Sequence, residues 1–238
     1  AFAGEWRVIA VDLRGRGLSD DAKDAASYNP AQYVADIEAL LEQAGIARFV
    51  AVGTSLGGIG TILLAARDAA RIAGAVINDI GPVISEKGLA RIAGYTGRTA
   101  AVDSWAAAAG YVRDINACAF PDNVDADWDK WARRAFAPDA AGRLAPRYDP
   151  NIAIALQTGK LRPTSLPLRM AFRKLTQERP VLLVRGTLSD LLSRKTFTRM
   201  GKEVPDAELV SVARTGHAPS LGEPEAREAI ARLLAKCA

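Results

Sequence analysis

Hydrophobic positions along the chain follow two different spacings. Short apolar runs rich in Val, Ile and Phe predict buried strands, and apolar residues at i, i+3 and i+4 predict helices. The predicted strands cover 7–13, 48–53, 73–80, 180–186 and 207–213. The predicted helices cover 31–45, 56–72, 194–204 and 224–237. Apolar strands separated by helices predict an α/β fold: a mostly parallel sheet with helices on both faces.

The alternation of strands and helices stops between Gly81 and about Ser165. Two helices are predicted in this block, at 104–120 and 125–137, and their bulky residues are Trp105, Tyr111, Trp128 and Trp131. An all-helical block inside an α/β chain indicates an inserted cap, in which we expect the tryptophans to pack in the core more than to line a pocket. The predicted division is core 1–82, cap 83–164 and core 165–238.

The stretch "VGTSLGGIG", 52–60, places Ser55 between a predicted strand and a predicted helix. It contains G-x-S-x-G, the pattern of a nucleophile elbow. In such a turn the hydroxyl is lifted above the sheet, and we expect side chains at Gly53 and Gly57 to clash with the bent backbone. The helix that follows points its first N–H groups at the site, where negative charge would develop.

A serine hydroxyl needs a base to become a good nucleophile. The chain has one histidine, His217, which follows the last predicted strand. The imidazole in turn needs a carboxylate to orient it. Asp190 follows the strand 180–186 and is the favoured partner, while Asp79 follows the strand 73–80 and is the alternative. Because the carboxyl ends of parallel strands share one sheet edge, either side chain is expected near Ser55.

Composition narrows the class of protein. The chain has 238 residues, 49% hydrophobic and 24% charged, with a net charge of +4, which is typical of a globular domain. No apolar run approaches the roughly 20 residues of a membrane span. A single histidine excludes multi-histidine metal sites. Two distant cysteines, Cys118 and Cys237, favour a reducing compartment, and we expect a cytoplasmic protein.

Basic residues gather in one region without interleaved aromatic residues, so the pattern favours a solvated face over an anion site and predicts no nucleic-acid partner. These residues are Lys160, Arg162, Arg169, Arg173 and Lys174.

The sequence resembles the α/β-hydrolase fold family, in its capped, lipid- and ester-cleaving branch. The matching segments, in chain order, are "DLRGRGLSD" (12–20), "GTSLGG" (53–58), "RGTLSD" (185–190) and "GHAP" (216–219). The resemblance implies Ser55 as nucleophile, Asp190 as acid and His217 as base, with the Leu56 N–H in the oxyanion hole. Some members of the family place the acid where Asp79 stands. The first segment is interpreted as a structural turn in which Asp12 and Arg14 hold the backbone.

The resemblance predicts a serine hydrolase that cleaves a carboxylic ester, lactone or thioester of a small hydrophobic acid, with no metal or organic cofactor. Cleavage of a C–C bond by the same triad is an alternative, and a non-catalytic ligand-binding relative is another. Haloalkane dehalogenation and epoxide hydrolysis are disfavoured, because the resemblance implies an Asp at the position of Ser55 for those activities. The natural substrate and the oligomeric state stay open.

Family members also have strands ahead of the segment that matches residue 1, one of them followed by an "HG" loop that gives the second oxyanion N–H. Nothing in this chain matches that strand. We therefore expect an N-terminally truncated sequence with weak or absent activity. The strand 7–13 would then pair directly with 48–53, or leave buried backbone groups unpaired.

Overall fold

The computed structural model describes residues 2–98, 101–157, 165–204 and 206–238. Its centre is a four-stranded parallel sheet with the order β1-β2-β5-β6. The strands are β1 (Phe49–Thr54), β2 (Ile72–Asn78), β5 (Val181–Gly186) and β6 (Glu208–Val212). Four predicted strands are confirmed to within two residues. Because the strands are parallel, the loops that follow them meet at one edge of the sheet.

Helices cover both faces of this sheet, as predicted. They are α1 (Pro30–Gln43), α2 (Leu56–Asp68), α7 (Leu166–Thr176), α8 (Arg194–Glu203) and α9 (Pro224–Ala235). Side chains alternate along β5: Leu183 packs with the cluster formed by α1, α2, α7 and α8, while Leu182 and Val184 pack with the cluster formed by α9. All are fully buried. Burial on both faces explains why the strand is a continuous apolar run.

Several helices begin where the sequence offers a side-chain cap. The Ser193 hydroxyl accepts a hydrogen bond from the Thr196 N–H at 3.1 Å, and Ser165 accepts one from Leu168 at 3.2 Å. Asn29 caps α1 in the same way, directly before a proline. These contacts satisfy N–H groups that have no partner within the helix.

The predicted strand at 7–13 is wrong. The segment has no strand pairing in the structure, and Val8 and Ile9 are 63% and 44% exposed. In the described part of the chain, β1 has a neighbour only on the β2 side, and the direct pairing of 7–13 with it is not formed. Without a partner strand the backbone polar groups of 7–13 stay in water, since burying them unpaired is unfavourable. The prediction was wrong because it rested only on the apolar composition of the segment.

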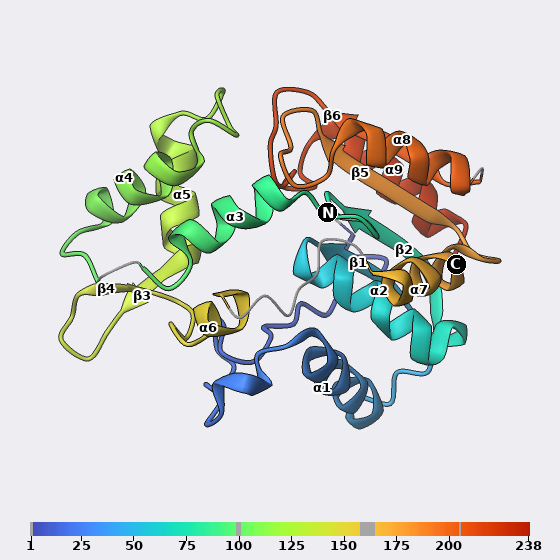
Figure 1. Cartoon of the computed structure of the whole chain (residues 1–238), viewed down its shortest axis with the longest axis horizontal. Helices are drawn as coiled ribbons and strands as arrows, with labels where there is room; N and C mark the ends of the chain where they lie inside the picture. Colours follow the sequence, from blue (N-terminus) through green and yellow to red (C-terminus); the bar gives the residue numbers. More distant parts are fainter. Residues whose placement is uncertain (1, 99–100, 158–164, 205) are drawn as a thin grey trace.

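The segment predicted as a cap stands beside the sheet, with α4 and α5 away from the core and α3 leading to them (Figure 1). Its elements are α3 (Glu86–Tyr95), α4 (Trp105–Asn116), α5 (Asp125–Ala135), β3 (Phe136–Pro138), β4 (Leu144–Pro146) and α6 (Ile152–Gln157). It is not all-helical, because β3 and β4 form an antiparallel pair. The division at 82 and 164 stays a prediction, and Lys160 and Arg162 lie outside the described residues.

The cap segment has its own apolar cluster. Trp128 is buried there and stacks on Trp131, with ring centroids 5.9 Å apart. Phe120 meets the Trp131 ring edge-on at 5.1 Å. The contact between Phe120 and Trp131 packs the connection between α4 and α5 against α5, apart from the sheet core.

Candidate active site

Ser55 occupies the sharp turn between β1 and α2. Its φ of 51° lies in the left-handed region, and its backbone N–H donates to the Asn78 carbonyl at 3.1 Å. A non-glycine residue with this φ is held there by its surroundings. A Cβ at position 53 would lie 2.5 Å from the Gly57 carbonyl oxygen, so the turn requires glycine at Gly53. The elbow therefore holds the hydroxyl at the carboxyl edge of the sheet.

The predicted need for glycine at Gly57 is wrong. A Cβ there would meet nothing within 4 Å, whereas one at Gly58 would lie 2.4 Å from Ile80 Cγ2. The close approach is thus one residue further along, where α2 packs on the segment after β2. The G-x-S-x-G pattern did not show which of the two glycines carries the contact.

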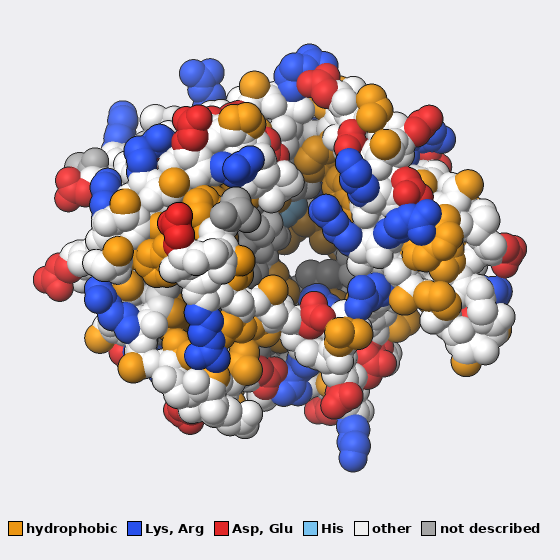
Figure 2. All heavy atoms as spheres, turned by 180° about the vertical axis from the view of Figure 1, so that it is seen from behind, with side chains coloured by type: hydrophobic (Ala, Val, Ile, Leu, Met, Phe, Trp, Pro, Cys, Tyr) orange, Lys and Arg blue, Asp and Glu red, His pale blue; other side chains and the backbone are white. Residues whose placement is uncertain are grey.

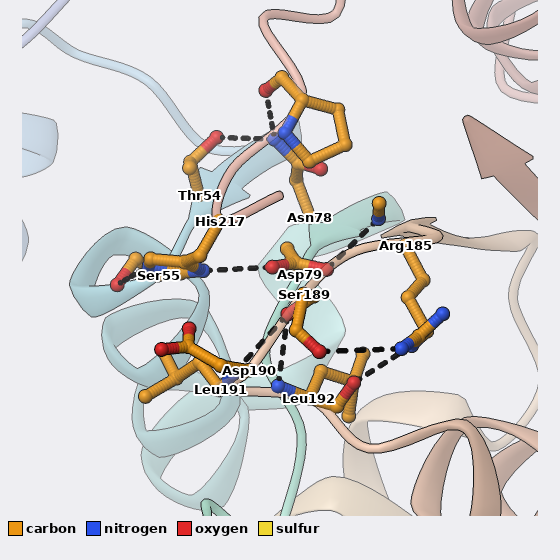
Figure 3. A network of polar contacts seen from close by, with 12 residues as sticks. Thr54, Ser55, Asn78, Asp79, Arg185, Ser189, Asp190, Leu191, Leu192 and His217 are labelled. Carbon is orange, nitrogen blue, oxygen red and sulfur yellow. Dashed lines mark hydrogen bonds and ion pairs between the residues drawn. The ribbon is translucent and has the colours of Figure 1, made fainter. Parts of the chain in front are cut away.

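His217 links the serine to a carboxylate. Its Nε2 lies 2.9 Å from Ser55 Oγ, and its Nδ1 lies 2.8 Å from Asp79 Oδ2 (Figure 3). The imidazole side chain is 9% exposed and the Asp79 side chain is fully buried. Three side chains from distant parts of the chain thus form one continuous line of hydrogen bonds.

The backbone beside His217 is held by the cap segment. The Gly216 N–H donates to the Ala119 carbonyl at 2.6 Å, and a Cβ on Gly216 would lie 2.4 Å from Ala119 Cβ. Ala119 lies in the connection between α4 and α5. The loop after β6 is therefore fixed from both sides, by the sheet and by this connection.

Asp79 directly follows β2, in a left-handed conformation with φ of 56°. Its second oxygen, Oδ1, accepts a hydrogen bond from the Gly186 N–H at 3.0 Å, and its own N–H donates to the Val184 carbonyl at 2.8 Å. A buried carboxylate needs such partners. With both oxygens engaged, the carboxylate is fixed in one orientation toward the imidazole.

Arg185 is a buried cation behind this carboxylate. Burial lowers the pKa of Arg185, and the negative charge of Asp79 opposes that shift. Its guanidinium donates to the Leu192 carbonyl at 2.7 Å and to the Ser189 carbonyl at 3.3 Å. Arg185 therefore shapes the loop after β5 as well as balancing the charge of Asp79. An arginine at the end of an otherwise apolar strand was the signal in the sequence.

Asp190 does not contact the imidazole, which corrects the favoured assignment. Its carboxylate forms a two-pronged ion pair with Arg91 of α3, at 2.5 Å and 2.9 Å, and no dashed line joins it to His217 in Figure 3. Arg91 lowers the pKa of Asp190, and His217 adds a smaller effect in the same direction. The alternative carboxylate, Asp79, takes the place beside His217. The sequence could not locate Arg91, because α3 was not predicted.

Asn78 ties together the loops of the site. Its side-chain nitrogen donates to Thr54 Oγ1 at 3.0 Å and to the Pro219 carbonyl at 2.8 Å. These contacts join the residue before Ser55 to the segment after His217. The sequence analysis missed this role. The "ND" pair at the end of an apolar strand was the available signal.

A cavity of about 700 Å³ opens in front of Ser55. Its wall is mainly apolar, with Leu89 and Ile92 from α3, Ile152 from α6 and Trp131 from α5. Figure 2 shows the molecule from behind, with a central opening near which hydrophobic side chains and charged side chains of both signs lie. Trp128 is a core residue as expected, whereas Trp131 also lines the cavity. Leu56, the first residue of α2, lies on the same wall beside Ser55.

The turn at 12–20 also lines the cavity, through Asp12, Arg16 and Gly17. Asp12 Oδ2 accepts a hydrogen bond from the Leu18 N–H at 2.9 Å, which holds the turn as expected. Arg14 instead pairs with Asp36 of α1, and the contact lowers the pKa of that carboxyl. The turn is thus fastened to α1 as well as to itself.

Within the described residues, no group of three or more His, Cys, Asp and Glu side chains is placed to hold a metal ion. The helices over the same residues include none that is long and apolar enough to cross a membrane.

Fold and site together define an enzyme of the hydrolase class, and comparison with known proteins agrees. The model of the alpha/beta hydrolase family matches residues 1–233, and the chain belongs to that family. A crystal structure of an alpha/beta hydrolase from Novosphingobium aromaticivorans is 44% identical, with a TM-score of 0.89, covering 94% of this chain and 78% of that one.

Two curated relatives are also hydrolases by name. The 3-hydroxybutyrate-oligomer hydrolase of Cupriavidus necator is 30% identical over 231 residues, which are 94% of this chain and 78% of the relative. The 2-(acetamidomethylene)succinate hydrolase of Mesorhizobium japonicum is 29% identical over 225 residues, which are 94% of this chain and 76% of the relative. The chain is therefore a hydrolase.

Proposed function

We propose that this hydrolase cleaves carboxylic esters, lactones or thioesters through an acyl-enzyme formed on Ser55. One observation carries the proposal: the hydrogen-bonded line from Asp79 through His217 to Ser55, with distances of 2.8 Å and 2.9 Å, at the mouth of an apolar cavity. In this proposal Asp79, rather than Asp190, is the acid of the triad.

The geometry supports a sequence of proton transfers. Ser55 Oγ attacks the ester carbonyl while His217 Nε2 takes its proton, and the Asp79 carboxylate stabilises the imidazolium through Nδ1. The tetrahedral oxyanion would accept a hydrogen bond from the Leu56 N–H, at the positive end of α2. The imidazolium then gives its proton to the leaving alcohol as the C–O bond breaks. Water, deprotonated by the same imidazole, releases the acid and restores Ser55.

The cavity favours a small or medium hydrophobic acyl group, because its wall is mainly apolar. Both curated relatives are named for substrates that are carboxylates, a hydroxybutyrate oligomer and a substituted succinate. Both kinds of compound contain carbonyl carbons, and a carbonyl carbon is the atom that Ser55 Oγ attacks in the proposed mechanism.

Labelling of the full chain with a fluorophosphonate probe tests the nucleophile. We expect one label per chain, on Ser55, and no label on Ser55→Ala. Ser211→Ala, at an exposed position of β6, is a matched control that removes a different serine and should still be labelled. A folded protein without labelling would contradict the proposal and favour the non-catalytic ligand-binding relative.

A substrate panel then separates ester from C–C cleavage. 4-Nitrophenyl esters of graded acyl length would be compared with a vinylogous diketone acid. Turnover of the esters, with an optimum at short or medium length, is the expected result. Turnover of the diketone acid alone would overturn the ester assignment while leaving Ser55 as the reactive residue.

A further inference from the structure

The cavity wall contains a group of cations that the proposed triad does not use. Arg16, Arg134 and Arg147 all line the same cavity as Ser55. They come from the turn at 12–20, the end of α5 and the residue after β4. Three cations on a mainly apolar wall need a reason, because an apolar ligand gains nothing from them.

Backbone hydrogen bonds bring these arginines to one part of the wall. The Gly17 N–H donates to the Arg147 carbonyl at 2.9 Å, and the Arg147 N–H donates to the Ala135 carbonyl at 2.8 Å. Each bond involves an arginine or its direct neighbour in the chain. The three segments are thus fastened together through their backbones at this part of the cavity wall.

Among the described residues, two of these arginines have no carboxylate partner within ion-pair distance. In the ranges that the structure describes, neither Arg134 nor Arg147 has an ion pair, whereas the adjacent Arg133 pairs with Asp129 at 2.8 Å. Asp12 is the acidic residue on the described wall, and one of its oxygens is already engaged by the turn. Arginines that line a cavity without carboxylate partners attract an anion from solution.

Arg16 is also held in place for such a contact. Its guanidinium donates to the Tyr33 hydroxyl at 3.1 Å and lies 5.3 Å from the centre of the Tyr33 ring. Stacking on an aromatic ring fixes the plane of the guanidinium while leaving other N–H groups available. A fixed planar cation is suited to the two oxygens of a carboxylate.

We propose that the substrate of this hydrolase carries a free carboxylate, and that Arg16, Arg134 and Arg147 bind it while the ester carbonyl lies at Ser55. The inference rests on the proposed ester hydrolysis and adds the class of substrate: monoesters of dicarboxylic acids, or esters whose far end is an acid. The apolar side chains between the two polar ends contact the connecting carbon chain.

Two esters of similar length test the proposal: 4-nitrophenyl hemiglutarate, which has a free carboxylate, and 4-nitrophenyl pentanoate, which has none. The unmodified chain should prefer the hemiglutarate by at least about tenfold in kcat/KM. Arg147→Gln and Arg134→Gln should each reduce that preference by about tenfold, mainly through KM. Arg143→Gln is the matched control: its side chain is exposed on the β3–β4 turn and pairs with Asp139, so the preference should be unchanged.

The outcomes distinguish this inference from the proposed function. Equal turnover of both esters, with no change in the arginine variants, would overturn the carboxylate site and leave ester hydrolysis standing. If neither ester is hydrolysed, the carboxylate site is tested separately by the binding of glutarate to the Ser55→Ala variant. Calorimetric binding that is weakened at least about tenfold by Arg147→Gln supports the site, and the absence of binding overturns it.

Discussion

The ends of β2 and β5 are neighbours in the sheet, and each is followed by an aspartate, yet the two carboxylates have different partners. Asp79 comes one residue after its strand, is fully buried and contacts His217. Asp190 comes four residues after its strand, is 26% exposed and contacts Arg91 of the cap segment. The path of the loop, more than the strand that it follows, therefore decides which carboxylate reaches the imidazole.

The largest expected effect comes from Asp79→Asn. The amide would turn an N–H group toward His217 Nδ1 and favour the wrong tautomer, so we expect kcat to fall by about 10⁴-fold. Activity toward a 4-nitrophenyl ester measures the change, and circular dichroism checks the fold. A loss of that size in Asp190→Asn, with a small loss in Asp79→Asn, would reverse the comparison and restore Asp190 as the acid.

Two glycine variants test separately the regions around Asp79 and Asp190, and both leave the two carboxylates in the chain. A Cβ at Gly186 would lie 2.3 Å from the Thr215 carbonyl, and one at Gly88 would lie 2.8 Å from the Asp190 carbonyl. Both alanine variants should lose about 1–3 kcal/mol of unfolding free energy. Gly186→Ala also displaces the N–H donor of Asp79, so its kcat should fall by at least about tenfold, against less than about threefold for Gly88→Ala. Similar kcat losses in both would argue against separate roles for the two regions.

The ion pair between Arg91 and Asp190 should contribute to stability rather than chemistry. Asp190→Asn and Arg91→Gln are each expected to lower the unfolding free energy by about 1 kcal/mol, with kcat changed by less than about tenfold. Urea denaturation of both single variants and the double variant gives the coupling between the side chains. A coupling near zero would mean that the contact does not help to hold α3.

The smallest expected effect is a dependence of stability on pH. The folded-state pKa of Asp190 is lowered, chiefly by Arg91. Its stabilising contribution is therefore present above the unfolded pKa of about 3.9 and is lost as the pH falls through the lowered value. The stability difference between the unmodified chain and Asp190→Asn should be constant near neutral pH and shrink below about pH 4. A difference that grows in acid would contradict this sign.

Much of the sheet could be predicted from the sequence because parallel strands buried on both faces are apolar throughout. The segment 7–13 has the same composition, but a strand also needs a lateral partner, and composition does not show whether one exists. The helices α3, α6 and α7 were missed, along with the β3–β4 pair. These are short or amphipathic elements whose burial depends on the cap segment and on α2.

Two site residues could be predicted because the sequence has one candidate for each role. Ser55 stood in a recognisable turn, and His217 was the one imidazole in the chain. The choice between Asp79 and Asp190 was not settled, because both follow neighbouring strands and the deciding residues, Gly186 and Arg91, have no special pattern. The catalytic role of each residue stays a prediction until the variants are measured.

The contact between Gly216 and Ala119 has a mechanical consequence. The imidazole ring is oriented by the sheet, whereas the backbone one residue before it hangs on the connection between α4 and α5. A displacement of that connection would therefore also move the backbone of His217. In the proposed triad, the distance from the imidazole to the Ser55 hydroxyl thus depends on the position of the cap segment.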